Sequence, residues 1–161
     1  NRNTKYDLND VFENYNLGEL FKQYGEGISK AVWNDLPSEL IIYRASHKDG
    51  VDGYSWSLHL GEAYMFSQNM RYGNGDSNQV IHQAKISKEK IFFFNNREDE
   101  IFLKFKDIEV GSLKELDLSK IKKKYEKNRD KIENKADFDK IINVENFYKD
   151  NKKKKSSFGL K

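Results

Sequence analysis

The spacing of apolar residues predicts helices at the start of the chain. Between residues 7 and 24 large apolar side chains recur every three or four positions, which is typical of amphipathic helices. A shorter helix is predicted over Gly27–Leu36. It should end before Pro37, the only proline, because a residue that precedes proline avoids the helical conformation. The recurring apolar residues are Leu8, Val11, Phe12, Tyr15, Leu17, Leu20, Phe21 and Tyr24.

The centre of the chain has the pattern of strands. Short segments rich in Ile, Phe and Tyr alternate with Gly- and Asn-containing turns, as in β-rich regions. One helix interrupts them, with Ala63 and Phe66 on its predicted core face. The order of helices, strands and again helices is typical of an α+β fold. The predicted elements are strands over Glu39–Ser46 and Gly53–Leu58, a helix over Leu60–Met70, and strands over Gln79–Ser87, Lys90–Asn95 and Glu98–Phe105.

The last part of the chain differs from the rest in charge. Residues 1–118 carry 14 basic and 19 acidic side chains, a balance of −5, whereas residues 119–161 carry 15 and 7, a balance of +8. The pattern from Asp117 onward is helical but sparsely apolar. We therefore expect a main domain over 1–118 and a basic helical extension of it over 119–161. Such a segment can meet a nucleic acid, a membrane surface or an acidic protein, or it can be a solvated, Lys-rich terminal helix.

Composition excludes several classes of protein. A chain of 161 residues with 37% hydrophobic residues, including 11 Phe and 9 Tyr, has material for one folded domain. The absence of cysteine excludes disulfide frameworks and thiolate sites. The apolar runs are only a few residues long, so no membrane-spanning helix is expected. The three histidines lack metal-ligand spacing, and no metal site is expected.

Three short motifs carry the candidate chemistry. An arginine at the end of an apolar strand must be paired, because a buried charge is costly. In a Ser-x-Ser strand the two serines share one face. In a Glu-x-Glu strand two carboxylates lie about 7 Å apart on one face, an arrangement that favours a cationic partner between them. The motifs are Tyr43-Arg44, Ser55-Trp56-Ser57 and Glu98-Asp99-Glu100.

In this order the motifs resemble the arginine–serine–glutamate class of mono-ADP-ribosyltransferases, which includes bacterial toxins and phage-encoded effectors. The resemblance covers roughly residues 39–110. It implies a mixed or antiparallel two-sheet β core with the helices of 7–36 packed on it. It also implies NAD as the substrate and a site of action in the cytoplasm of a bacterial or host cell. The chain departs from the pattern at Trp56 and in the brevity of residues 58–97.

The resemblance also implies roles for individual residues. Arg44, with Tyr43 beside it, would bind NAD, because its planar fork suits a pyrophosphate. Glu100 would stabilise the oxocarbenium-like state in which the nicotinamide bond breaks. Ser55 would hold Glu100 by a hydrogen bond. Ser57 would support the strand.

The second glutamate and the aromatic residues complete the implied site. Glu98 would orient or deprotonate the attacking group, and a glutamate there is associated with arginine acceptors in this class. An aromatic ring is needed to stack on nicotinamide. The candidates are Tyr64, Trp56 and Phe66, of which Phe66 fits better in the core.

Several acceptors remain open at this stage. The favoured reaction transfers ADP-ribose from NAD to a protein arginine. With the same fold, the basic segment 119–161 could present a base of RNA or DNA as acceptor, and such binding would depend on salt. Water as acceptor would give simple NAD hydrolysis. A non-enzymatic module that binds nucleic acid is the remaining alternative, although Glu98 and Glu100 would repel phosphate on such a surface.

Overall fold

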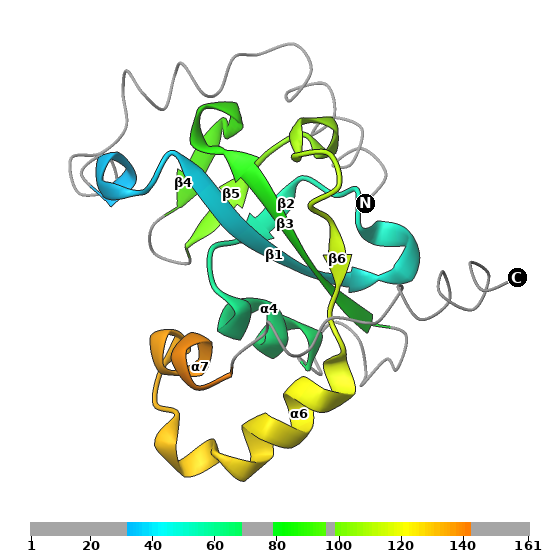
Figure 1. Ribbon diagram of the computed structural model, residues 1–161, viewed down its shortest axis with the longest axis vertical. Coiled ribbons are helices and arrows are strands. Elements are labelled where there is room, and N and C mark those ends of the chain that lie inside the picture. The colour runs from blue at the N-terminus through cyan, green and yellow to red at the C-terminus, as the bar shows by residue number, and fades with distance from the viewer. Residues whose placement is uncertain (1–31, 69–78, 96–98, 143–161) are drawn as a thin grey trace, which may run out of the picture.

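The computed structural model describes residues 32–68, 79–95 and 99–142 (Figure 1). The helices predicted between residues 7 and 24 lie outside these ranges. Of the helix predicted over Gly27–Leu36, residues 32–35 are described and are helical. This helix ends before Pro37, as predicted.

Six strands form one antiparallel sheet in the order β4-β5-β2-β1-β3-β6. The central pair is the longest, because β1 and β3 run side by side from Glu39↔Ser87 to His47↔Gln79. The mixed α+β class is therefore confirmed. The strands are β1 (Glu39–His47), β2 (Ser55–Ser57), β3 (Gln79–Ser87), β4 (Phe93–Asn95), β5 (Glu100–Phe102) and β6 (Lys114–Glu115).

The expectation of two sheets is wrong for the described residues. The short strand β2 joins the two halves, because it pairs with β1 at Tyr43↔Ser57 and with β5 at Trp56↔Ile101. Both pairings are antiparallel, so the sheet is continuous across β2. This continuity brings the Arg44 strand, the serine strand and the Glu100 strand next to one another in space.

Three of the predicted strands are shorter than expected, since β2 covers only Ser55–Ser57 of the predicted Gly53–Leu58, and β4 and β5 are shortened as well. The segment Lys88–Lys90 forms a 3-10 turn, so β4 starts only at Phe93. β5 starts at Glu100 rather than at residue 98, because Asp99 has a left-handed backbone with φ of 51°. A second 3-10 turn at Phe105–Asp107 lies beyond its other end. Local turns thus precede β4 and lie at both ends of β5.

Both faces of the sheet are covered by apolar side chains. One face carries a cluster around Trp33, Ile42, Trp56 and Phe94. The other face packs against α4 (Leu60–Ser67), α6 (Leu118–Lys127) and α7 (Lys135–Ile141), which lie together on the same side in Figure 1. Strand alternation explains this division, because neighbouring residues of a strand point to opposite faces.

The helices after residue 117 are anchored in this second cluster. Ile121, Phe138 and Ile142 are almost fully buried there. Asp117 begins α6 as its N-cap, since its side chain accepts a hydrogen bond from the backbone N–H of Lys120. Within the described ranges, no helix has both the length and the apolar character needed to cross a membrane.

Candidate active site

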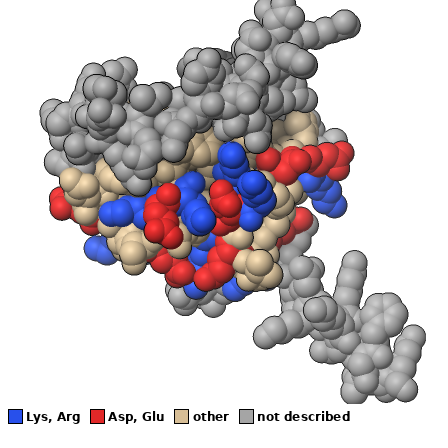
Figure 2. All heavy atoms as spheres, turned by 90° about the horizontal axis from the view of Figure 1, so that it is seen from above, with Lys and Arg blue, Asp and Glu red and all other residues tan. Residues whose placement is uncertain are grey.

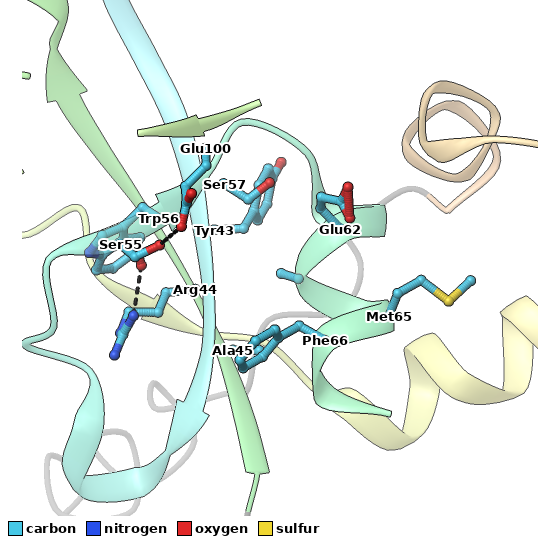
Figure 3. Close-up of a pocket in the computed structure, with 11 residues that line it drawn as sticks. Tyr43, Arg44, Ala45, Ser55, Trp56, Ser57, Glu62, Met65, Phe66 and Glu100 are labelled. Carbon is cyan, nitrogen blue, oxygen red and sulfur yellow. Dashed lines mark hydrogen bonds between the residues drawn. The ribbon is translucent and has the colours of Figure 1, made fainter. Parts of the chain in front are cut away.

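A pocket of about 390 Å³ opens between the middle of the sheet and α4 (Figure 3). The strands β1, β2 and β5 supply its polar wall, and α4 supplies the opposite wall. Residues of all three predicted motifs lie on the sheet wall. They are Tyr43, Arg44, Ser55, Ser57 and Glu100. The helix wall contains Glu62, Met65 and Phe66.

The guanidinium of Arg44 is held by backbone carbonyl groups. Its Nε donates to the carbonyl of Gly50 at 2.9 Å, and an Nη donates to the carbonyl of Ser55 at 2.7 Å. Burial lowers the pKa of Arg44, and the charge of Asp52 opposes this shift. Gly53 packs directly against the guanidinium, since an added Cβ would lie 2.1 Å from Nη2. The arginine is therefore paired and fixed, as a buried charge requires.

Ser55 and Glu100 meet across neighbouring strands. Ser57 lies opposite Glu100 in the ladder, and Ser55 lies opposite Phe102, so Ser55 is diagonal to Glu100 on one face. The Ser55 hydroxyl donates a hydrogen bond to Oε2 of the Glu100 carboxylate (Figure 3). This bond is the one that the resemblance implies. The bond orients the carboxylate through its Oε2 oxygen.

Ser57 stabilises the connection from β2 to α4. Its hydroxyl oxygen accepts a hydrogen bond from the backbone N–H of His59 at 3.0 Å and donates to the carbonyl of His59 at 3.1 Å. Tyr43 lies opposite Ser57 on β1, half-buried at the edge of the pocket. These two residues therefore shape the pocket between the sheet and the helix.

Of the three predicted stacking residues, Tyr64 lies outside the pocket lining, whereas Trp56 belongs to the lining although it is almost fully buried. Trp56 is 1% exposed in the first apolar cluster, and its indole N–H donates to the carbonyl of Gly53 at 3.0 Å. Tyr64 is 3% exposed, and its ring centroid lies 5.1 Å from those of Tyr125 and Phe138. Burial raises the pKa of Tyr64 to about 12. Tyr64 is therefore not placed to stack on a ligand in this pocket, and stacking by Trp56 stays a prediction.

Phe66 has the opposite outcome. The sequence favoured a core position for it, but its side chain is 52% exposed and lines the pocket beside Met65. The reason is the orientation of α4, which turns Tyr64 toward α6 and α7 and leaves Phe66 at the opening. Phe66 is thus the aromatic ring that α4 presents to the pocket (Figure 3).

The Glu98 prediction lies outside the described residues. It assumed that Glu98 and Glu100 share one face of a single strand. Because β5 begins at Glu100 and Asp99 has a positive φ, strand alternation does not extend back through Asp99. The placement of Glu98 beside Glu100 therefore stays a prediction.

A charged network beside the pocket was missed from the sequence. His59 Nδ1 lies 2.7 Å from Asp139 Oδ2, and its Nε2 lies 3.3 Å from Asp99 Oδ2. Lys135 Nζ lies 2.7 Å from the same Asp99 oxygen and 3.7 Å from Glu62 Oε1. Among the described residues, no group of His, Asp and Glu side chains is arranged to hold a metal ion. No local motif signals this network, because its members are distant in sequence.

The pocket therefore combines a fixed guanidinium, an oriented carboxylate and an exposed aromatic ring. Such a site can bind an anionic group, stabilise a developing positive charge, and stack against a planar ring. No protein-family model, curated protein or solved structure matches the chain.

Proposed function

We propose that the protein is a mono-ADP-ribosyltransferase that moves ADP-ribose from NAD to a macromolecular acceptor and releases nicotinamide. The hydrogen bond from Ser55 to Glu100, in the same pocket as Arg44, carries this proposal. These three residues come from three motifs, and a pocket of about 390 Å³ has the size of small-molecule sites.

Arg44 is the proposed anchor of the NAD pyrophosphate. Its two hydrogen bonds to carbonyl groups fix the plane of the guanidinium. Further N–H donors of the fork remain for phosphate oxygens, and a planar fork binds such oxygens in pairs. Because the group is already ordered, little side-chain entropy is lost when NAD binds.

Glu100 is the proposed catalytic carboxylate. Cleavage of the bond between nicotinamide and ribose develops positive charge on the ribose, as in glycoside chemistry. A carboxylate fixed in advance near that charge stabilises it without further reorganisation. The Ser55 hydroxyl supplies the orientation, and Phe66 is the proposed stacking partner of nicotinamide on the α4 wall.

The acceptor is proposed to be a protein arginine, with Glu98 as the residue that orients or deprotonates it. A nucleic-acid base bound through the basic C-terminal segment is the alternative acceptor. On the face seen in Figure 2, the basic and acidic side chains of the described residues are interspersed. That face therefore offers no continuous basic surface to a phosphate backbone.

The decisive experiment follows NAD labelled in its adenylate part. The chain is incubated with labelled NAD and host lysate, and released nicotinamide and labelled macromolecule are measured together. Label removed by protease supports the protein acceptor, and label removed by nuclease supports the nucleic-acid acceptor. If the parent protein releases no nicotinamide and transfers no label, the proposed function is wrong.

Variants of the two glutamates separate the proposed roles. Glu100→Gln should reduce both nicotinamide release and transfer by roughly a hundredfold or more, because it removes the stabilising charge. Glu98→Gln should reduce transfer but leave residual hydrolysis by water. Glu89→Gln, at an exposed position in the Lys88–Lys90 turn, is the matched control and should behave like the parent. Full hydrolysis by Glu100→Gln would contradict the carboxylate assignment.

A further inference from the structure

We propose that His59 and Lys135 are positioning residues that hold the turn at Asp99 and thereby set the carboxylate of Glu100 for the reaction. This inference rests on the proposed function for its catalytic consequence. The structural part, a fixed Asp99 turn, is independent of that function. The four residues involved besides Glu100 are His59, Asp99, Lys135 and Asp139.

The backbone of Asp99 needs external support. With φ of 51°, it is the one non-glycine residue with positive φ in the described ranges. Such a conformation is unfavourable for most side chains, and it persists where the surroundings fix it. Glu100 follows directly and begins β5, so the direction in which β5 starts depends on the conformation of Asp99.

Two different segments of the chain hold Asp99. The backbone N–H of Leu58 donates to the carbonyl of Asp99 at 3.0 Å. On the side chain, one carboxylate oxygen lies 2.7 Å from Lys135 Nζ and 3.3 Å from His59 Nε2. The contacts therefore come from the link between β2 and α4 and from α7, and they constrain both the main chain and the side chain of the turn.

His59 is in turn fixed by α7. Its Nδ1 lies 2.7 Å from Asp139 Oδ2, and the other Asp139 oxygen accepts a hydrogen bond from the backbone N–H of Gly61 at 2.9 Å. The imidazole thus lies between two carboxylates. Both ring nitrogens can donate hydrogen bonds only when the ring is protonated. The network is complete in that protonation state.

The charged groups around His59 influence the pKa of its imidazole. Asp139 and Lys135 face it from α7, and Asp99 faces it from the turn before β5, while Glu62 on α4 contacts Lys135. The hydrogen bond to Asp139 raises the pKa of His59 above its ordinary value of 6.5, and burial and Lys135 oppose this rise. The protonated form therefore predominates at pH 6.5 and below. It is lost as the pH rises through the raised pKa.

The network predicts a specific kinetic effect. Glu100 acts on the transition state, so a misplaced carboxylate lowers kcat more than it changes KM for NAD. A displacement on the scale of an ångström can reduce rates by up to about a hundredfold. We expect kcat for NAD hydrolysis in the parent to fall as the pH rises through the pKa of His59. We expect no such fall in His59→Gln.

The test measures NAD hydrolysis for the parent and for variants across that pH range. His59→Gln and Lys135→Gln should lower kcat by roughly tenfold or more with little change in KM. Lys140→Gln is the matched control, because Lys140 lies exposed on the same helix and outside the network. Asp99→Gly tolerates the positive φ but lacks the carboxylate, and it should lose as much activity as His59→Gln.

Amide exchange of Leu58 supplies a readout without NAD. This N–H bonds to the Asp99 carbonyl, so it should exchange faster in His59→Gln and Lys135→Gln than in Lys140→Gln. If these variants keep the parental kcat, pH profile and Leu58 exchange, the positioning role is wrong. If the parent cleaves no NAD, the proposed function is wrong. Leu58 amide exchange still tests the structural part in that case: unchanged exchange in His59→Gln and Lys135→Gln would show that these residues do not hold the Asp99 turn.

Discussion

Replacing Gly53 by alanine should displace the Arg44 guanidinium and weaken NAD binding, although Arg44 itself is not replaced. Gly53 precedes β2 and packs against the guanidinium, and an added Cβ would lie 2.1 Å from Arg44 Nη2 and 2.4 Å from Cζ. Real Cβ contacts are never this short, so the guanidinium must move. Because φ of Gly53 lies outside the left-handed region, alanine imposes no backbone strain of its own.

The cost follows from the contacts that the displaced arginine loses. These are the hydrogen bonds to the carbonyl groups of Gly50 at 2.9 Å and Ser55 at 2.7 Å. A hydrogen bond to a charged group contributes about 1.5–3 kcal/mol. The released guanidinium regains contact with water, so we expect the free energy of unfolding to fall by only about 1–3 kcal/mol. Loss of one such bond to NAD corresponds to roughly tenfold to hundredfold weaker binding.

The assay combines NAD titration calorimetry with denaturant unfolding. Gly50→Ala is the matched control, because a Cβ there meets Ser46 Cβ at an ordinary 3.4 Å and the Gly50 carbonyl is retained. Gly53→Ala should weaken NAD binding about as much as Arg44→Ala, and Gly50→Ala should bind like the parent. Parental NAD affinity in Gly53→Ala would refute the role given to the Arg44 fork.

Three further predictions concern single side chains. Arg44→Lys should restore only part of the NAD affinity lost in Arg44→Ala in the same calorimetric titration, because an ammonium lacks the planar fork. Phe66→Ala should raise KM for NAD in the hydrolysis assay. It should change the free energy of unfolding by no more than about 0.5 kcal/mol, since the ring is 52% exposed. Asp117→Ala should lower the unfolding free energy by about 1 kcal/mol in urea, through loss of the α6 N-cap, without changing NAD hydrolysis.

The long central strands were predictable from the sequence. β1 was predicted over Glu39–Ser46 and extends to His47, and β3 has the predicted bounds Gln79–Ser87. Both are apolar enough to be identified locally, because strands in the middle of a sheet are buried on both faces. The helical pattern predicted from Asp117 onward is also present, since α6 covers Leu118–Lys127 with Asp117 as its N-cap.

The ends of the short strands depended on neighbouring structure. β4 and β5 each pair over three residues; a 3-10 turn lies before β4, and a left-handed residue precedes β5. A predicted strand over Glu98–Phe105 fits the residue types there but not the turn at Asp99. The sequence also could not predict a single sheet, because this depends on the pairing of β2 with β1 on one side and with β5 on the other.

The candidate site was predictable only in its polar half. The contact of Ser55 with Glu100 spans 45 residues, and the order of short motifs indicated it. It was not predictable that Tyr64 lies in the core and Phe66 lines the pocket. Both are apolar residues on one helix, and the packing of α4 against α6 and α7 decides which of them is buried.

By itself the sequence determined the elements with strong local patterns and the residue types of the site. Tertiary structure decided which side chains meet. His59 and Asp139 are 80 residues apart and belong to no shared motif, yet they lie 2.7 Å from each other. Local patterns report a residue's preference for helix, strand or burial. A contact between polar side chains from distant segments leaves no such pattern, because it arises only when α7 packs beside α4.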